Sequence, residues 1–209
     1  MARSKQIFNG DPTTRESILA SARAEIDQYG IIGLRLSAVA EKAQVSVPLI
    51  YKYFEDRDGL LAVVLGDWYE GFVFQYRSMI DNWIDSAEQI SLEQFAQLSP
   101  KPGVGAMQKD REFRLKVLAT ALENPQLHQR VKKTTIDAHA WIESTIDRIK
   151  PKLPQSDQFF DRRFLTLLLF NTMYVFDDML DRESISDESY IELLAHLIRA
   201  SSHANTPKK

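Results

Sequence analysis

Several classes of protein are excluded by what this sequence lacks. It has no cysteine among its 209 residues, so disulfide frameworks, thiolate-bound zinc sites and cysteine nucleophiles are ruled out. Its longest apolar run, residues 164–176, is interrupted by polar residues and is shorter than the roughly 20 residues that span a bilayer. The basic residues at the N-terminus are not followed by an apolar run, so we predict no signal peptide and a cytoplasmic protein.

A surplus of positive charge is also missing. The net charge is −3, which argues against indiscriminate binding of polyanions but leaves room for a local contact surface. Within residues 1–65 eight basic residues balance eight acidic ones, so sequence-independent attraction to nucleic acid should be modest. The basic residues are Arg3, Lys5, Arg15, Arg23, Arg35, Lys42, Lys52 and Arg57, and the acidic ones are Asp11, Glu16, Glu25, Asp27, Glu41, Glu55, Asp56 and Asp58.

The common sequence motifs of catalysis are missing as well. There is no Gly-rich phosphate loop, no His-Glu metal motif and no serine elbow. The four histidines are scattered, and His139 has only Glu143 one turn away, so we predict neither a metal nor another cofactor. We therefore do not expect an enzyme, although an all-helical enzyme stays open as an alternative that turnover of a candidate ligand would revive.

Helical periodicity dominates what is present, and alternating strand patterns are absent. With 44% hydrophobic residues the chain can build a sizeable core, as one large domain or as a small and a larger one. We predict an all-α fold of about nine helices. The predicted segments are 13–29, 37–43, one starting at 46, 56–66, 68–84, 107–123, 125–149, 157–180 and 187–202, with a weaker one at 86–98 and a loop at 99–105.

Two of these helices, within residues 36–54, are very short and adjoin each other. Ser37 is placed to cap the first of them, which ends near Ala43. Ser46 is placed to cap the second, and Pro48 is tolerated in the first turn because the missing N–H has no helical partner there. Two short helices joined by a tight turn predict a helix-turn-helix.

The second short helix has the character of a helix that enters the major groove of DNA. Ile50 and Phe54 are four residues apart, so they share a face and can anchor the helix. Lys52 can neutralise a phosphate or donate to a guanine edge, and tyrosine hydroxyls suit phosphates. Taken alone, Tyr51, Lys52 and Tyr53 would better suit an ordinary surface helix with a packed aromatic, and the surrounding pattern is what favours DNA contact. The side chains left for the sides and the outer face are Val47, Pro48, Leu49, Tyr51, Lys52 and Tyr53.

A resemblance to a known family rests on residues 12–65. The run "TRESILASARAEIDQYG", the later run "LRLSAVAEKAQVSVPLIYKYFEDRDGLL" and the pattern Val-Ser-x-Pro-x-Ile-Tyr-x-Tyr-Phe resemble the N-terminal domain of the TetR family of transcriptional regulators. Arg57 stands where the family usually has lysine. Gln44 occupies a turn position that often holds glycine, so the turn costs energy if its backbone is left-handed.

The resemblance implies two domains, a helix-turn-helix domain at 12–66 and a helical ligand-binding and dimerisation domain at 67–204. The second resembles the family only in architecture. The resemblance also implies a homodimer that binds a palindromic DNA operator. The residues expected at the DNA are Arg15, Ser37, Ser46, Val47, Pro48, Leu49, Tyr51, Lys52, Tyr53 and Arg57.

The second predicted domain is rich in large, adaptable side chains, and pockets built from such residues bind apolar or aromatic ligands. Taken singly, each of these side chains is better explained by packing in an ordinary core. Asn171 interrupts an apolar helix, so it could orient a ligand or bond to a neighbouring helix. The candidate ligand residues are Trp68, Phe72, Tyr76, Met107, Phe113, Phe170, Asn171 and Tyr174.

Dimerisation is expected along the helices 125–149 and 157–180, which correspond to the family's four-helix dimer interface. The second of these is apolar nearly all round in its middle, which requires burial on several sides. The candidate interface residues are Trp141, Ile142 and Leu168, and a monomeric core helix is the alternative.

The resemblance implies a repressor that a small ligand releases from its operator, and the side chains of the second domain suit an apolar or aromatic ligand. Such release requires the ligand to have different affinities for two arrangements of the protein. An activator, or a regulator that responds to no ligand, would use the same scaffold, because a fold dictates neither sign nor effector.

Overall fold

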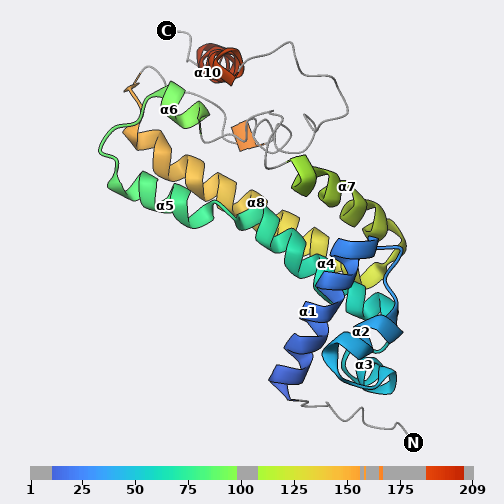
Figure 1. The fold of residues 1–209 in the computed structure, drawn as a ribbon. Coiled ribbons are helices and arrows are strands. Elements are labelled where there is room, and N and C mark those ends of the chain that lie inside the picture. The colour runs from blue at the N-terminus through green and yellow to red at the C-terminus, as the bar shows by residue number, and fades with distance from the viewer. Residues whose placement is uncertain (1–10, 98–107, 156–157, 159–164, 167–186, 205–209) are drawn as a thin grey trace, which may run out of the picture. The chain divides into compact units, whose positions relative to one another are not determined.

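The computed structural model describes residues 11–97, 108–155, 158, 165–166 and 187–204. Most of these residues are helical and none lies in a strand, so the predicted all-α fold of about nine helices is confirmed for them (Figure 1). No helix in these ranges has the length and apolar character to cross a membrane. The helices are α1 (Pro12–Tyr29), α2 (Leu36–Ala43), α3 (Val47–Phe54), α4 (Arg57–Phe74), α5 (Arg77–Ser86), α6 (Leu92–Ala96), α7 (Gln108–Glu123), α8 (Pro125–Ile149), the 3-10 turn η1 (Lys150–Lys152) and α10 (Asp187–Ala204).

The chain divides into two compact units whose boundaries cut through three helices. Unit 1 contains residues 11–71 and Lys116–Lys132, and unit 2 contains the described residues of Phe72–Leu115 and Lys133–Lys209. Helices α4, α7 and α8 therefore each contribute one end to unit 1 and the other to unit 2. The expected domain boundary between residues 66 and 67 stays a prediction.

Unit 1 is built around α1. Asp11 begins this helix by accepting a hydrogen bond from the Thr13 amide at 3.1 Å, and Gly30 ends it with a φ of 75°. The apolar stripe of α1 is buried. Further buried apolar side chains lie at helical spacing on α2, α3 and α4. The buried apolar side chains of the four helices include Ile18, Leu19, Ala22, Ile26, Val39, Ala40, Ala43, Ile50, Phe54, Leu60, Leu61, Val64 and Leu65.

The junction between α7 and α8 is fastened to the start of α4. Asn124 is only 4% exposed, and its side-chain amide donates to the carbonyl of Asp58 at 2.9 Å. Its side-chain oxygen accepts from the Leu127 amide at 3.0 Å, which caps the first turn of α8. One buried side chain therefore ties three helices of unit 1 together.

Unit 2 packs α5, α6, α8 and α10 around a second apolar core. Its members include Ile84, Phe95, Ile146 and Ile198, all buried. On the rim, Arg148 donates to Asp81 and Asp85 at 2.6 Å each, and these carboxylates raise the pKa of Arg148 above its ordinary value.

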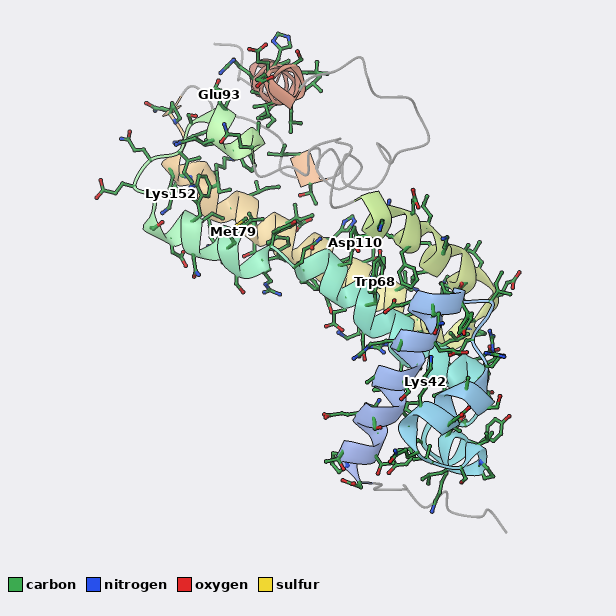
Figure 2. The ribbon with its side chains drawn as sticks, viewed as in Figure 1. Lys42, Trp68, Met79, Glu93, Asp110 and Lys152 are labelled. Atoms are coloured by element: carbon green, nitrogen blue, oxygen red, sulfur yellow. The ribbon has the colours of Figure 1, made fainter. Side chains whose placement is uncertain are left out.

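The polar edge of α6 meets α10. Ser91 and Gln94 form a capping box at the start of α6, which stabilises this five-residue helix. Glu93, labelled in Figure 2, accepts from Arg199 of α10 at 3.1 Å. The prediction of one weak helix over 86–98 is therefore wrong in its extent. Residues 87–91 are not helical, and a new helix begins at Leu92 behind the capping box.

Two further predicted boundaries are wrong in the middle of the chain. Gly66 does not end a helix, because α4 runs on to Phe74, and the predicted helix 68–84 is instead divided between α4 and α5. The guanidinium of Arg130 packs against the bare Cα of Gly66, which explains a glycine inside a helix. The break after Phe74 has neither glycine nor proline, so no local residue type announces it.

Candidate nucleic-acid interface

The turn between α2 and α3 has the left-handed backbone that glycine usually supplies. Gln44 has φ 56° and ψ 41°, and the Val45 amide donates to the Ala40 carbonyl at 2.9 Å to close the turn. A left-handed non-glycine residue costs about 1–2 kcal/mol, so the packing of the two helices must offset that cost. Helix α2 begins at Leu36 rather than at Ser37. The predicted cap at Ser37 is therefore wrong, since extended Arg35 precedes the helix and Ser37 lies inside its first turn.

Helix α3 is anchored by the two predicted residues, Ile50 and Phe54, which are 0% and 5% exposed. Ser46 precedes the helix as predicted, but its hydroxyl makes no capping hydrogen bond. The exposure of α3 then follows the helical period. Pro48, Tyr51 and Lys52 are exposed, and Val47, Leu49 and Tyr53 are half-buried.

Two contacts fasten α3 to the start of α1. The Tyr53 hydroxyl donates to the Asp11 carbonyl at 3.2 Å, and the guanidinium of Arg15 lies 5.5 Å from the centre of the Phe54 ring. Tyr53 thus has a structural task that its sequence position did not reveal. Arg15 is exposed beside α3, so a phosphate contact is geometrically open to it.

Arg57, expected at DNA, directs its donors into the protein. Its Nη2 donates to the carbonyls of Ile31 and Ile32 at 3.0 and 3.2 Å, and its Nε donates to the carbonyl of Leu34 at 3.3 Å. These bonds hold the segment between α1 and α2 against the start of α4. The side chain is still 39% exposed, so its role at DNA stays a prediction.

A buried carboxylate between α1 and α2 was not predicted. The side chain of Glu25 is fully buried, and it pairs with Lys42 at 2.7 Å and with Arg35 at 3.5 Å. Hydrogen bonding from Lys42, helped by the charges of Lys42 and Arg35, lowers the pKa of Glu25 despite its burial. Figure 2 labels Lys42 in this part of the molecule. The sequence signal that could have predicted this burial is the position of Glu25, which lies three residues after Ala22 on the apolar stripe of α1.

These internal pairs use much of the positive charge of unit 1. Arg35 and Lys42 are engaged by Glu25, and the guanidinium of Arg23 lies 3.4 Å from a carboxylate oxygen of Asp67. Arg15, beside α3, and Lys52, on its outer face, are both exposed.

The ligand and dimer candidates are spread over the two units. Phe72 and Phe113 are half-buried in unit 2, where Tyr76 is 42% exposed, while half-buried Trp68 belongs to unit 1. The candidates Met107, Leu168, Phe170, Asn171 and Tyr174 lie outside the described residues.

The two described dimer candidates pack within their own unit. Ile142 is 6% exposed in the core of unit 2. The indole of Trp141 meets the Phe74 ring edge-on at 6.1 Å, and its N–H lies 3.4 Å from Asp81. Their part in a dimer interface stays a prediction.

The helix-turn-helix geometry agrees with a family comparison. Residues 18–64, which contain α2 and α3 whole, match the family described as "Bacterial regulatory proteins, tetR family". This N-terminal segment belongs to the TetR family. The resemblance found in the sequence is thereby confirmed for the N-terminal segment.

Solved structures extend the likeness over nearly the whole chain. Salmonella enterica GusR superposes with a TM-score of 0.59 at 16% identity and covers 93% of this chain and 98% of its own. The multidrug binding protein EbrR, complexed with imidazole, gives 0.60 at 21% identity, with coverages of 90% and 96%. FadR from Bacillus subtilis, in complex with stearoyl-CoA, gives 0.51 at 14% identity, with coverages of 90% and 98%.

At these identities the likeness establishes the fold of the TetR-family regulators and no particular ligand. No curated protein sequence matches this chain significantly.

Proposed function

We propose that this protein is a repressor that binds a palindromic operator as a homodimer, with one α3 in each half-site. The observation that carries the proposal is the anchoring of α3. Ile50 and Phe54 fix one face of the helix in the core, and Pro48 and Lys52 stand exposed on the opposite face. A short helix held in this way is suited to the major groove. Because its target is bacterial DNA, we expect the protein in the cytoplasm.

The DNA contacts proposed for each protomer divide by chemistry. Arg15 and Lys52 are exposed cations suited to phosphates, and the Tyr51 hydroxyl, on a side chain that is 46% exposed, is a further phosphate partner. The first turn of α3 is suited to the bases. We keep Ser37, Ser46, Tyr53 and Arg57 as candidates for backbone contacts, although Tyr53 and Arg57 also bond within the unit.

A small apolar or aromatic ligand in the second domain is proposed as the signal for release. Support comes from two proteins of similar fold that were solved with a ligand, the multidrug binding protein EbrR with imidazole and the transcriptional regulator FadR with stearoyl-CoA. The half-buried aromatics Phe72 and Phe113 are the described side chains of unit 2 offered for this role. Dimerisation through Trp141, Ile142 and Leu168 belongs to the same proposal, and no catalytic role is proposed.

The test is a gel shift of the full-length protein on the DNA upstream of its own gene, at stated salt concentrations. We expect a sequence-selective shift, which Lys52→Ala weakens and Lys116→Ala leaves unchanged. Lys116 is the matched control because it is an exposed lysine of the same unit, placed on α7. A shift that does not distinguish this DNA from a scrambled duplex would contradict operator binding.

The direction of regulation needs a separate measurement. Deleting the gene should raise expression of the target if the protein represses, and a fall would identify an activator on the same scaffold. Mass spectrometry of the purified protein for a co-purified small molecule addresses the effector.

A further inference from the structure

We propose that the first turn of α3 recognises its operator through the 5-methyl groups of thymine, with Val47, Pro48 and Leu49 as the specificity-determining residues. This inference rests on the proposed function, because it presumes that α3 enters the major groove. Beyond the proposed function, the inference predicts the kind of operator sequence, namely half-sites with T·A pairs opposite the first turn of α3.

The placement of the three side chains follows from the anchored face. Each residue of an α-helix turns by about 100°, so Pro48, two residues before buried Ile50, lies about 200° away from the core. Its exposure agrees with that position. By the same rule Leu49 lies on one flank, about 100° from Ile50, and Val47 lies on the other side, only about 60° from Ile50. Both side chains are half-buried. The turn therefore presents three carbon surfaces outward and to the sides.

The chemistry of the turn excludes most base contacts. In a helix-turn-helix, the N-terminal residues of the second helix contact the base edges. None of these three side chains has a hydrogen-bonding atom, and Pro48 also lacks a backbone N–H. In the major groove the thymine methyl is the one apolar group among the four bases, and it is the usual partner of apolar side chains.

An apolar turn also selects against other bases. A guanine or adenine edge placed against Leu49 would lose its water without gaining a hydrogen bond, and burial of an unpaired polar group is costly. The same side chains that gain from a methyl group therefore penalise its replacement, so preference for thymine has an attractive and a repulsive part.

The hydrogen-bonding side chains of α3 are directed to other tasks. The Tyr53 hydroxyl donates to the Asp11 carbonyl, so it serves the attachment of α3 to α1. Tyr51 and Lys52 are exposed one turn further along, where phosphates are their natural partners. Ser46, directly before the first turn of α3, makes no capping hydrogen bond.

The backbone of the turn is held in place from both sides. The Leu49 amide donates to the Ser46 carbonyl at 3.0 Å, and the preceding turn is closed by the bond from Val45 to Ala40. Pro48 has a fixed φ angle. A rigid backbone lets contacts as short-ranged as those to a methyl group discriminate between bases, because the backbone does not need to be ordered on binding.

The experiment begins with selection of tight-binding duplexes from a random library by the full-length protein. We expect thymine to be enriched at neighbouring positions of both half-sites. Each of these thymines is then replaced by deoxyuridine, which removes the methyl group and keeps the base pair. Every replacement in a contacted position should weaken binding about fourfold, the value for one buried carbon group. A thymine outside the half-sites serves as the control and should show no change.

Variants assign the methyl groups to side chains. Leu49→Ala should lose the sensitivity to deoxyuridine at one position of each half-site and keep it at the others, while Leu49→Met, which stays apolar, should retain it. Lys52→Ala should weaken binding to thymine and deoxyuridine duplexes by the same factor. Melting curves of each variant establish that it is folded before its binding is compared.

Two outcomes would count against the reasoning at different levels. If the protein selects a palindromic duplex but binds it equally well with deoxyuridine, reading through methyl groups is refuted and the operator-binding proposal stands. If the protein selects no duplex at all, both the proposed function and this inference are refuted.

Discussion

The close approach of Arg130 to Gly66 predicts that Gly66→Ala destabilises the wild-type protein but stabilises a variant that lacks the Arg130 side chain. A Cβ added at Gly66 would lie 2.7 Å from the Nε and Cζ atoms of Arg130. That guanidinium donates to the Val63 carbonyl at 2.9 Å and to Asp67 at 2.7 Å. Gly66→Ala must therefore displace the arginine from both partners, although alanine is the better residue for a helix.

The two effects have estimable magnitudes. Replacing a glycine inside a helix by alanine stabilises it by about 1 kcal/mol. A hydrogen bond to a charged group contributes about 1.5–3 kcal/mol. We take about 2 kcal/mol for the bonds from Arg130 to Val63 and Asp67 together, because the Arg130 side chain is 33% exposed and solvent weakens its interactions. Gly66→Ala should then destabilise the wild-type protein by about 1 kcal/mol. In an Arg130→Ala background the clash is gone, and the same change should stabilise by about 1 kcal/mol.

The assay is urea unfolding of the wild type, both single variants and the double variant, followed by circular dichroism. The double-mutant cycle should give a coupling of about 2 kcal/mol between the two positions. A Gly66→Ala protein that is more stable than the wild type would refute the reasoning, because it would show that Arg130 moves aside without loss. Equal effects of Gly66→Ala in both backgrounds would refute it as well.

Three further predictions concern unit 1. The pKa of Glu25 is lowered in the folded protein, so its stabilising contribution is present above the ordinary value of about 4.5 and is lost as the pH falls through the folded value. Glu25→Gln should flatten this part of the acid limb in melting temperatures measured against pH, and an unchanged limb would show that Lys42 does not hold the carboxylate. Lys52→Ala should leave the melting temperature unchanged. It should make the slope of log K for operator binding against log salt concentration shallower by about 1.8, because two phosphates per dimer lose a contact. An unaltered slope would show that Lys52 does not contact the DNA. Tyr53→Phe should lower the free energy of unfolding by about 1 kcal/mol through loss of the bond to Asp11, and urea unfolding at wild-type stability would show that this bond contributes nothing.

The sequence was sufficient for the helix-turn-helix because its signals are local. Apolar residues at helical spacing placed α1, and the pair Ile50 and Phe54 identified the buried face of α3. Gly30 stands directly after the last residue of α1, where helices favour glycine.

The details that could not be predicted depend on contacts between distant residues. Gly66 looks like a helix terminator in isolation, and only Arg130, 64 positions later in the chain, explains why it lies inside α4. The structural tasks of Tyr53 and Arg57 are hidden for the same reason, since their partners are backbone carbonyls that any residue could supply. The break between α4 and α5 has no local residue signal at all.

The membership of Lys116–Lys132 in the same compact unit as α1–α3 bears on attempts to build hybrid regulators. A hybrid that transplants only residues 12–66 onto the body of another family member would leave Asn124 and Arg130 behind. The carbonyl of Asp58 would then lose its buried amide donor, and the carbonyl of Val63 would lose its guanidinium. Successful recombination of operator preference between relatives should therefore exchange both stretches of chain together.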